Sequence, residues 1–385
     1  MEVRILSAAP SSRPASRLAS AICLTPTVPP RTLPRVVQGI VYHGPGDIRL
    51  GTIADPALRE PEDVVVRVTR TAICGSDLHV VHGLPLPDRG FALGHEFVGV
   101  VEDVGPAVRR FRKGQRVLAS CTTGCGRCVP CRRGLVSACE TTTAGGASNL
   151  FGFSCGLPGG QAEAVRVPHA DANLLAVPTD LDDERILFLS DILPTGHMAA
   201  ELAEVGPGDA VVVLGCGPVG VFAQRCAELR GASRILAADL DDGRLAGARS
   251  RGYDVVNSGR EDLAARVLEW SGGRGADAVI EAVGRPELVA KALELARHGG
   301  RVSFVGVILE PAPFFLGLLL MKHLTLRAGI VSPQAHWPRL LPLIEAGRID
   351  PTEIVSHRLP LADGVRGYEL FDKHEDGALK VVLQP

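Results

Sequence analysis

The residues VVVLGCGPVG, 211–220, are the most informative feature for the architecture of the second half of the chain. It places Gly215, Gly217 and Gly220 directly after an apolar run and at the head of a predicted helix. In that context a G-x-G-x-x-G pattern permits a tight turn, a close approach of the backbone to a pyrophosphate, and close packing of helix on strand. The phosphates would meet the positive end of the helix dipole. The pattern therefore predicts a dinucleotide site.

Asp239 is the acid that we expect to select the dinucleotide. It ends the next apolar run, nineteen residues after Gly220. A carboxylate at this position accepts hydrogen bonds from the ribose hydroxyls of NAD and repels the 2′-phosphate of NADP. The sequence therefore predicts NAD as the cofactor. The expected contacts within the motif and after it come from Gly215, Gly217, Pro218, Val219, Gly220 and Asp239.

Strand and helix patterns alternate around this motif and predict a parallel, doubly wound sheet. Earlier in the chain, short strands and Gly/Pro turns without a clear long helix predict a β-barrel-like domain. We therefore expect an α/β protein with a barrel domain and a Rossmann domain. The predicted strands of the Rossmann domain lie in 208–215, 233–239, 277–284 and 301–306, with helices over 219–230 and 242–252. The expected division is 1–36 as a disordered extension, 37–190 as the barrel domain, 191–330 as the Rossmann domain and 331–385 as a return to the barrel domain.

The first 36 residues differ in composition from the rest. They are rich in Pro, Ser, Ala and Arg and show no sustained periodicity. Such a segment buries too little apolar surface to order itself. A transit peptide and an overlong start remain alternatives, but six prolines oppose the amphipathic helix of a transit peptide, so an unstructured tail is favoured.

Composition excludes several classes of partner. A formal net charge of −2 over 385 residues gives no reason to expect nucleic acid or an anionic membrane surface. The apolar run FFLGLLLM, 314–321, is too short to span a membrane, and we expect it to be a buried strand or helix segment. With no signal peptide pattern, the cytoplasm is the expected location.

Four cysteines in one short loop follow the pattern C-x2-C-x2-C-x7-C. Four thiolates this close can surround one tetrahedral zinc, and such a site is closed and structural. A pair of disulfides or four unrelated thiols is the alternative, which an intracellular chain makes less favourable. The predicted ligands are Cys125, Cys128, Cys131 and Cys139.

A second constellation of zinc-type ligands lies in TAICGSDLHVVHG (71–83) and FALGHEFVGVVEDVG (91–105). It contains Cys74, His95 and Glu96, and the glycines around His95 have a characteristic spacing. Together with the four-cysteine loop and the dinucleotide motif, this pattern resembles the zinc-dependent medium-chain alcohol dehydrogenases over residues 37–385. The resemblance implies a GroES-like barrel for the catalytic domain.

The resemblance also implies a second, catalytic zinc, giving two zinc ions per subunit. Cys74 and His95 match two of its ligands, and Asp191 in LSDILPTGH matches the third, where many members have cysteine. This exchange resembles the branch that includes glutathione-independent formaldehyde dehydrogenases. Glu96 matches an acid that can enter or leave the zinc shell, and Asp77 matches the carboxylate that orients the histidine.

Other roles follow from the same resemblance. Ser76 matches the hydroxyl that takes the proton of the substrate, and His79 the base that passes it to the surface. Thr195 matches a residue that contacts the nicotinamide. Arg244 matches a basic residue near the adenosine ribose, and Lys380 one that contacts the pyrophosphate.

The expected activity is transfer of a hydride between an alcohol or polyol and NAD, giving an aldehyde or ketone. A formaldehyde dehydrogenase and an NADPH-dependent carbonyl reductase are alternatives, and a non-catalytic dinucleotide-binding scaffold is an alternative of another class. The resemblance implies a homodimer or homotetramer. The identity of the alcohol does not follow from the sequence.

Overall fold

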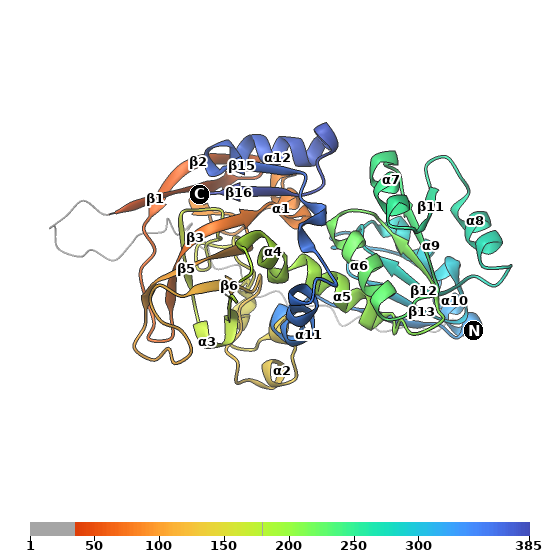
Figure 1. The fold of residues 1–385 in the computed structure, drawn as a ribbon, viewed down its shortest axis with the longest axis horizontal. Helices are drawn as coiled ribbons and strands as arrows, with labels where there is room; N and C mark the ends of the chain where they lie inside the picture. The colour runs from red at the N-terminus through yellow and green to blue at the C-terminus, as the bar shows by residue number, and fades with distance from the viewer. Residues whose placement is uncertain (1–34, 179) are drawn as a thin grey trace, which may run out of the picture.

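The computed structural model describes residues 35–178 and 180–385, which form a GroES-like domain and a Rossmann domain, as predicted (Figure 1). The extension expected over the first 36 residues lies, up to residue 34, outside the described residues. The two domains are joined by α5 (Ile192–Leu202) and, on the return, by α11 (Pro333–Glu345).

The Rossmann domain is a six-stranded sheet in which every pairing is parallel, with the order β11-β10-β9-β12-β13-β14. The strand order reverses at β9, and ligands of open α/β sheets bind at such a switch point. The strands are β9 (Ala210–Leu214), β10 (Arg234–Asp239), β11 (Asp254–Asn257), β12 (Ala276–Glu281), β13 (Ala296–Phe304) and β14 (Thr325–Ala328). The helices are α6 (Pro218–Leu229), α7 (Asp242–Ser250), α8 (Leu263–Trp270), α9 (Pro286–Leu295) and α10 (Leu316–Lys322).

Side chains of β9 alternate between two cores, one on each face of this sheet. Val211 and Val213 pack into the core that includes α5, α6 and α11, whereas Val212 and Leu214 pack into the core that includes α8 and α9. Because this central strand is buried on both faces, its sequence is a continuous apolar run and does not alternate with polar residues.

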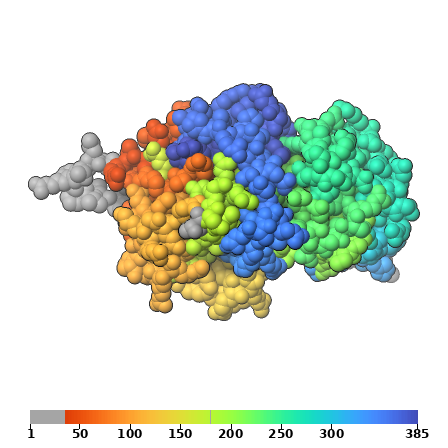
Figure 2. All heavy atoms as spheres, viewed as in Figure 1, coloured from red at the N-terminus to blue at the C-terminus, as the bar shows by residue number. Residues whose placement is uncertain are grey.

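The GroES-like domain contains a three-stranded sheet, β2-β1-β4, and a seven-stranded sheet, β15-β16-β3-β5-β6-β8 with β7 paired to β3. The last two strands come from the C-terminal end of the chain, which returns to this domain (Figures 1 and 2). The strands are β1 (Val36–Gly44), β2 (Asp47–Ala54), β3 (Val64–Ala72), β4 (Phe91–Ala92), β5 (Glu96–Val104), β6 (Arg116–Ala119), β7 (Ala164–Val167), β8 (Leu174–Ala176), β15 (His357–Pro360) and β16 (Val381–Gln384). Its helices are α1 (Gly75–Val81), α2 (Val129–Arg132), α3 (Ala170–Asn173), α4 (Asp183–Leu187) and α12 (Gly364–Lys373).

The pairing of β3 with β5 brings the first two predicted ligand segments together. The antiparallel register ends at Ala72 opposite Glu96, so Cys74 emerges beside His95. The close approach of the strands depends on Gly99, because a Cβ there would lie 2.1 Å from the carbonyl oxygen of Arg67.

The expectation of a buried segment over 314–321 is wrong. These residues contribute to α10, which packs against β13 and α9, and Leu316, Leu320 and Met321 are 62%, 71% and 62% exposed. An apolar run of this length is compatible with burial, but here the helix lies on the outside of the single chain.

We predict that Gly99→Ala destabilises the protein by about 1–3 kcal/mol or more, because the new methyl group must displace the backbone of β3. Gly247→Ala is the matched control. Gly247 lies within α7, and its nearest new contact is the flexible side chain of Arg251 at 3.7 Å. This change should be neutral or stabilising by about 0.5–1 kcal/mol. Urea unfolding measures both variants, and equal stability would contradict the argument.

Candidate functional site

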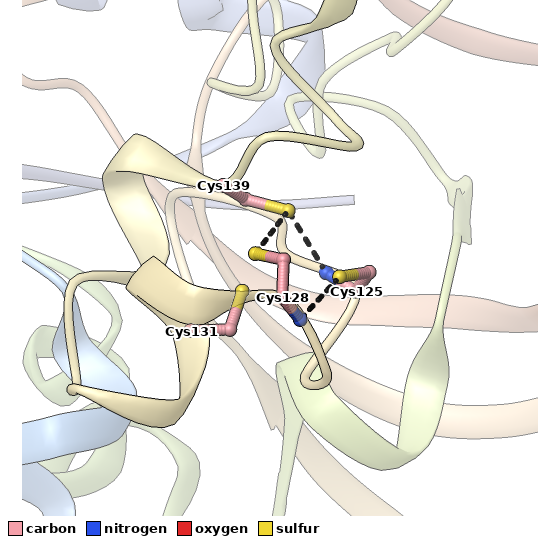
Figure 3. Close-up of side chains that lie close together, drawn as sticks. All are labelled: Cys125, Cys128, Cys131 and Cys139. Carbon is pink, nitrogen blue, oxygen red and sulfur yellow. Dashed lines mark hydrogen bonds between the residues drawn. The ribbon is translucent and has the colours of Figure 1, made fainter.

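The four cysteines of the predicted structural site converge in one loop (Figure 3). Their sulfur atoms all lie within 4.8 Å of one another, and all four are free thiols. Cys128 Sγ and Cys139 Sγ are 3.8 Å apart, which is too long for a disulfide. It matches the S···S edge of about 3.8 Å in a tetrahedron with zinc–sulfur bonds of about 2.3 Å. The donor set therefore fits a closed zinc site.

Backbone amides around this loop support thiolate charge. The N–H of Cys125 donates to Cys139 Sγ at 3.2 Å, and the N–H of Cys128 donates to Cys125 Sγ at 3.4 Å. At Cys139, burial opposes ionisation, but hydrogen bonds from Thr142 and neighbouring amides outweigh it and lower the pKa to about 5. A thiolate is the form that ligates zinc.

A second cluster combines residues from three separate segments. Donor atoms of Cys74, His95, Glu96 and Asp191 lie within 4.8 Å of one another. Cys74 precedes α1, His95 directly precedes β5 and Glu96 begins it, and Asp191 is the N-cap of α5. Asp191 Oδ2 lies 3.6 Å from Cys74 Sγ and 3.2 Å from His95 Nε2. One sulfur, one nitrogen and carboxylate oxygen suit zinc.

The ring of His95 is oriented by the buried carboxylate of Asp77. His95 Nδ1 lies 3.2 Å from Asp77 Oδ1, which leaves Nε2 facing Asp191. Burial disfavours the charged ring, but Asp77, Cys74 and Asp191 outweigh burial and raise the pKa of His95. Such an outer carboxylate fixes the tautomer of a histidine ligand and increases its basicity.

Two further residues hold Asp77 in place, and the sequence did not reveal either. The amide of Gln161 donates to Asp77 Oδ2 at 3.2 Å, and the hydroxyl of Tyr368 donates to Gln161 Oε1 at 2.8 Å. Both side chains are buried. The only local signal is that a polar glutamine stands in the glycine-rich run before β7, and no spacing rule links it to Tyr368.

Glu96 pairs with Lys380 in the interior. Lys380 Nζ donates to Glu96 Oε1 at 2.7 Å, and both side chains are 0% exposed. Within the described part of the chain, Glu96 Oε2 is buried without a hydrogen-bond partner, which leaves one carboxylate oxygen available to a cation. The pyrophosphate contact expected of Lys380 stays a prediction, and its ion pair with Glu96 was not foreseen.

The residues expected to act on the substrate lie around this cluster. Ser76 Oγ is 3.2 Å from His95 Nε2. Thr195 donates its hydroxyl to Asp191 Oδ1 at 3.0 Å, one turn into α5. His79 lies in α1 and is half-buried, and burial together with His82 lowers the pKa of His79. Their catalytic roles stay predictions.

The glycine motif forms the turn between β9 and α6. Gly215 has a φ of +97°, and Gly217 is the N-cap of α6, with Pro218 in its first turn. A Cβ on Gly220 would lie 2.0 Å from the carbonyl oxygen of Gly215. The helix start is therefore closed to side chains and open to a phosphate group.

Asp239 lies at the end of β10 beside this turn. Its Oδ2 accepts a hydrogen bond from the N–H of Cys216 at 2.7 Å, and its Oδ1 accepts from Leu240 and Asp241. A carboxylate offers about four acceptor sites, so capacity for a ribose hydroxyl is left. Arg244 lies nearby, with Nη2 3.0 Å from His374 Nε2. The cofactor contacts of Asp239, Arg244 and Val219 stay predictions.

Comparisons with known proteins identify both halves of the chain. Residues 60–179 match the alcohol dehydrogenase GroES-like domain family, and residues 218–346 match the zinc-binding dehydrogenase family. A zinc-type alcohol dehydrogenase-like protein of Bacillus subtilis is 35% identical over 91% of this chain and 100% of its own length.

Two other relatives bear on the activity. The structure of an alcohol dehydrogenase from Thermus sp. ATN1 has a TM-score of 0.84 and 40% identity, and covers 90% of this chain and 99% of its own. A glutathione-independent formaldehyde dehydrogenase of Pseudomonas aeruginosa is 32% identical over 87% of this chain and 94% of its own length.

We predict that Cys128→Ala removes one zinc per chain and lowers the melting temperature, because a structural zinc contributes directly to folding. Cys226→Ala is the control, since Cys226 is a buried thiol of α6 that is not part of either cluster. Elemental analysis of the purified variants gives the count. An unchanged zinc content in Cys128→Ala would contradict the assignment, as would an equal loss in both variants.

Proposed function

The chain belongs to the zinc-type medium-chain alcohol dehydrogenase family, and we propose that it transfers a hydride between an alcohol or polyol and NAD. The observation that carries this proposal is the position of α5. Its N-cap, Asp191, is part of the candidate metal cluster, and its middle packs so closely on α6 that a Cβ on Gly196 would lie 2.6 Å from Phe222. Because α6 begins with the dinucleotide motif, one helix joins the two halves of the site.

Cys74, His95 and Asp191 would hold the catalytic zinc, with Glu96 as a further donor, and the four clustered cysteines would hold the structural one. When bound, the catalytic zinc supplies a Lewis acid next to the substrate oxygen. Asp77 orients His95 for this role, and Lys380 neutralises the buried Glu96. The carboxylate of Asp191 replaces the thiolate that many family members have, and it keeps the same ligand charge.

The chain's own groups would move the proton and position the reactants. Ser76 presents its hydroxyl beside His95 Nε2, where it would take the proton of an alcohol while it releases its own proton toward His79. The lowered pKa of His79 favours the neutral ring, which is the form that can take up a proton and release it to water. Thr195, held by Asp191, would orient the nicotinamide.

NAD is favoured over NADP by Asp239. The carboxylate is held at the end of β10 by three backbone N–H groups, and a 2′-phosphate near it would meet an ion of the same sign. This argues against the NADPH-dependent carbonyl reductase. A non-catalytic scaffold is disfavoured because the metal donors, Ser76 and Asp77 converge in one place.

The exposed apolar helix α10 supports the expected homodimer or homotetramer. Leu316, Leu320 and Met321 are exposed on α10, which packs against β13 and α9, and β14 is the edge strand of the same sheet. An apolar surface at an unpaired strand edge favours association with a second chain.

A membrane-spanning helix must be long and almost wholly apolar, and none of the helices in the described residues meets both conditions.

The test of the proposed activity is NAD reduction with primary, secondary and polyol substrates. Formaldehyde belongs in the panel because one relative is a formaldehyde dehydrogenase. We expect turnover with at least one alcohol, lost on treatment with a zinc chelator and restored by zinc. If protein shown to hold both zinc ions neither oxidised the alcohols nor reduced the corresponding carbonyl compounds, the proposal would be contradicted. Turnover of formaldehyde alone would select that narrower activity.

We predict that Asp239→Ser weakens NAD binding, because the ribose hydroxyls lose a charged acceptor and the 2′-phosphate of NADP is no longer repelled. The preference for NAD over NADP should fall by about 10-fold or more, which corresponds to about 1.4 kcal/mol or more. Asp242→Asn is the matched control, because it removes a neighbouring charge at the exposed start of α7. The ratio of kcat/KM for the two cofactors measures the effect. An unchanged ratio in Asp239→Ser, or an equal change in the control, would refute the role of Asp239.

A further inference from the structure

A third group of metal-type donors lies between α5 and α11, apart from the two clusters already described. His197 and Glu201 stand one turn apart on α5, and His336 stands on α11. The Nδ1 atoms of the two histidines are 2.9 Å apart, and each lies 3.5 Å from Glu201 Oε2. Both histidines are buried.

These separations fit a divalent cation. The point equidistant from the three donor atoms lies about 1.9 Å from each of them, and zinc binds imidazole nitrogen and carboxylate oxygen at about 2.0–2.2 Å. A zinc ion slightly out of the plane of the three atoms therefore meets the bond lengths with little movement. A fourth position remains for water.

The protonation of the histidines also suits a metal. Burial lowers the pKa of His197, and burial together with His197 lowers the pKa of His336 to about 4. A lowered pKa favours the neutral imidazole, which is the form that ligates metal. The alternative is a hydrogen bond in which one Nδ1–H donates to the other Nδ1.

Glu201 divides its two oxygens between different partners. Oε1 pairs with Arg339 and lies 3.9 Å from Arg230, whereas Oε2 faces the histidines. The arginines fix the carboxylate in place but also add positive charge, which weakens the attraction for a cation. We therefore expect this site to bind zinc less tightly than the four-cysteine site.

We propose that His197, Glu201 and His336 form a third zinc site, which fastens α11 to α5. The helix α5 carries Asp191 at its N-cap, so a metal at its other end would restrain the helix that bears a catalytic ligand. The site is distinct in its ligands from both clusters of the proposed function and does not rest on that function.

The test is the zinc content of the full chain after equilibration with micromolar zinc. Four proteins are compared: the unaltered chain, His336→Gln, Glu201→Gln, and His323→Gln as a control for an exposed histidine on the surface. We expect the unaltered chain and the control to bind one zinc more than the other two. Zinc should also raise their melting temperature, because a ligand that binds only the folded state stabilises it.

The comparison of variants separates this site from the other two, since their zinc is common to all four proteins. Glu201→Gln keeps both imidazoles and tests the site even if His336→Gln is unstable. Equal zinc content in all four proteins would overturn the proposal and leave the histidines as a hydrogen-bonded pair. An extra zinc lost only in His323→Gln would assign it to the surface and overturn the proposal equally.

Discussion

The candidate catalytic centre depends on one buried carboxylate, that of Asp77. It accepts a hydrogen bond from the N–H of Cys74, another from Gln161, and faces His95 Nδ1. A buried charge of this kind is costly unless it is paired and hydrogen-bonded, and here its partners come from three different segments. Through the two hydrogen bonds to Oδ2 and the approach of His95 Nδ1 to Oδ1, this one carboxylate relates the positions of two metal donors and the orientation of a ring. Tyr368, from α12, extends the same network to the C-terminal return of the chain.

The helix α5 connects this centre to the cofactor half. Asp191 at its start belongs to the metal cluster, Thr195 contacts Asp191, and Gly196 permits the close packing on α6. The proposed third site lies farther along the same helix, where His197 and Glu201 meet α11. A single helix therefore relates three features of the molecule, and a shift along it would affect each of them. Its rigidity is a requirement of the proposed chemistry, since effective catalysis needs well-positioned groups.

The sequence predicted the features that are local in the chain. The glycine motif, the alternation of strands and helices and the four-cysteine loop are short patterns with a direct physical meaning, and the first two predict the Rossmann domain. The GroES-like form of the barrel domain was implied by the resemblance to the alcohol dehydrogenases. The pairs Lys380–Glu96 and Tyr368–Gln161 join residues 284 and 207 positions apart, and no spacing rule reaches that far. The prediction of burial over 314–321 was wrong for another reason. Apolar character predicts burial, but it does not say whether the same chain or a second one covers the surface.

Locating the catalytic metal is the decisive experiment for the proposed site. Crystals of the zinc-loaded protein, measured on both sides of the zinc absorption edge, locate each zinc by its anomalous signal. We predict a peak within bonding distance of Cys74 Sγ, His95 Nε2 and a carboxylate oxygen of Asp191, in addition to the peak among the four cysteines. A zinc-loaded structure with no peak at Cys74, His95 and Asp191, or with a peak bound by a different set of residues, would contradict it.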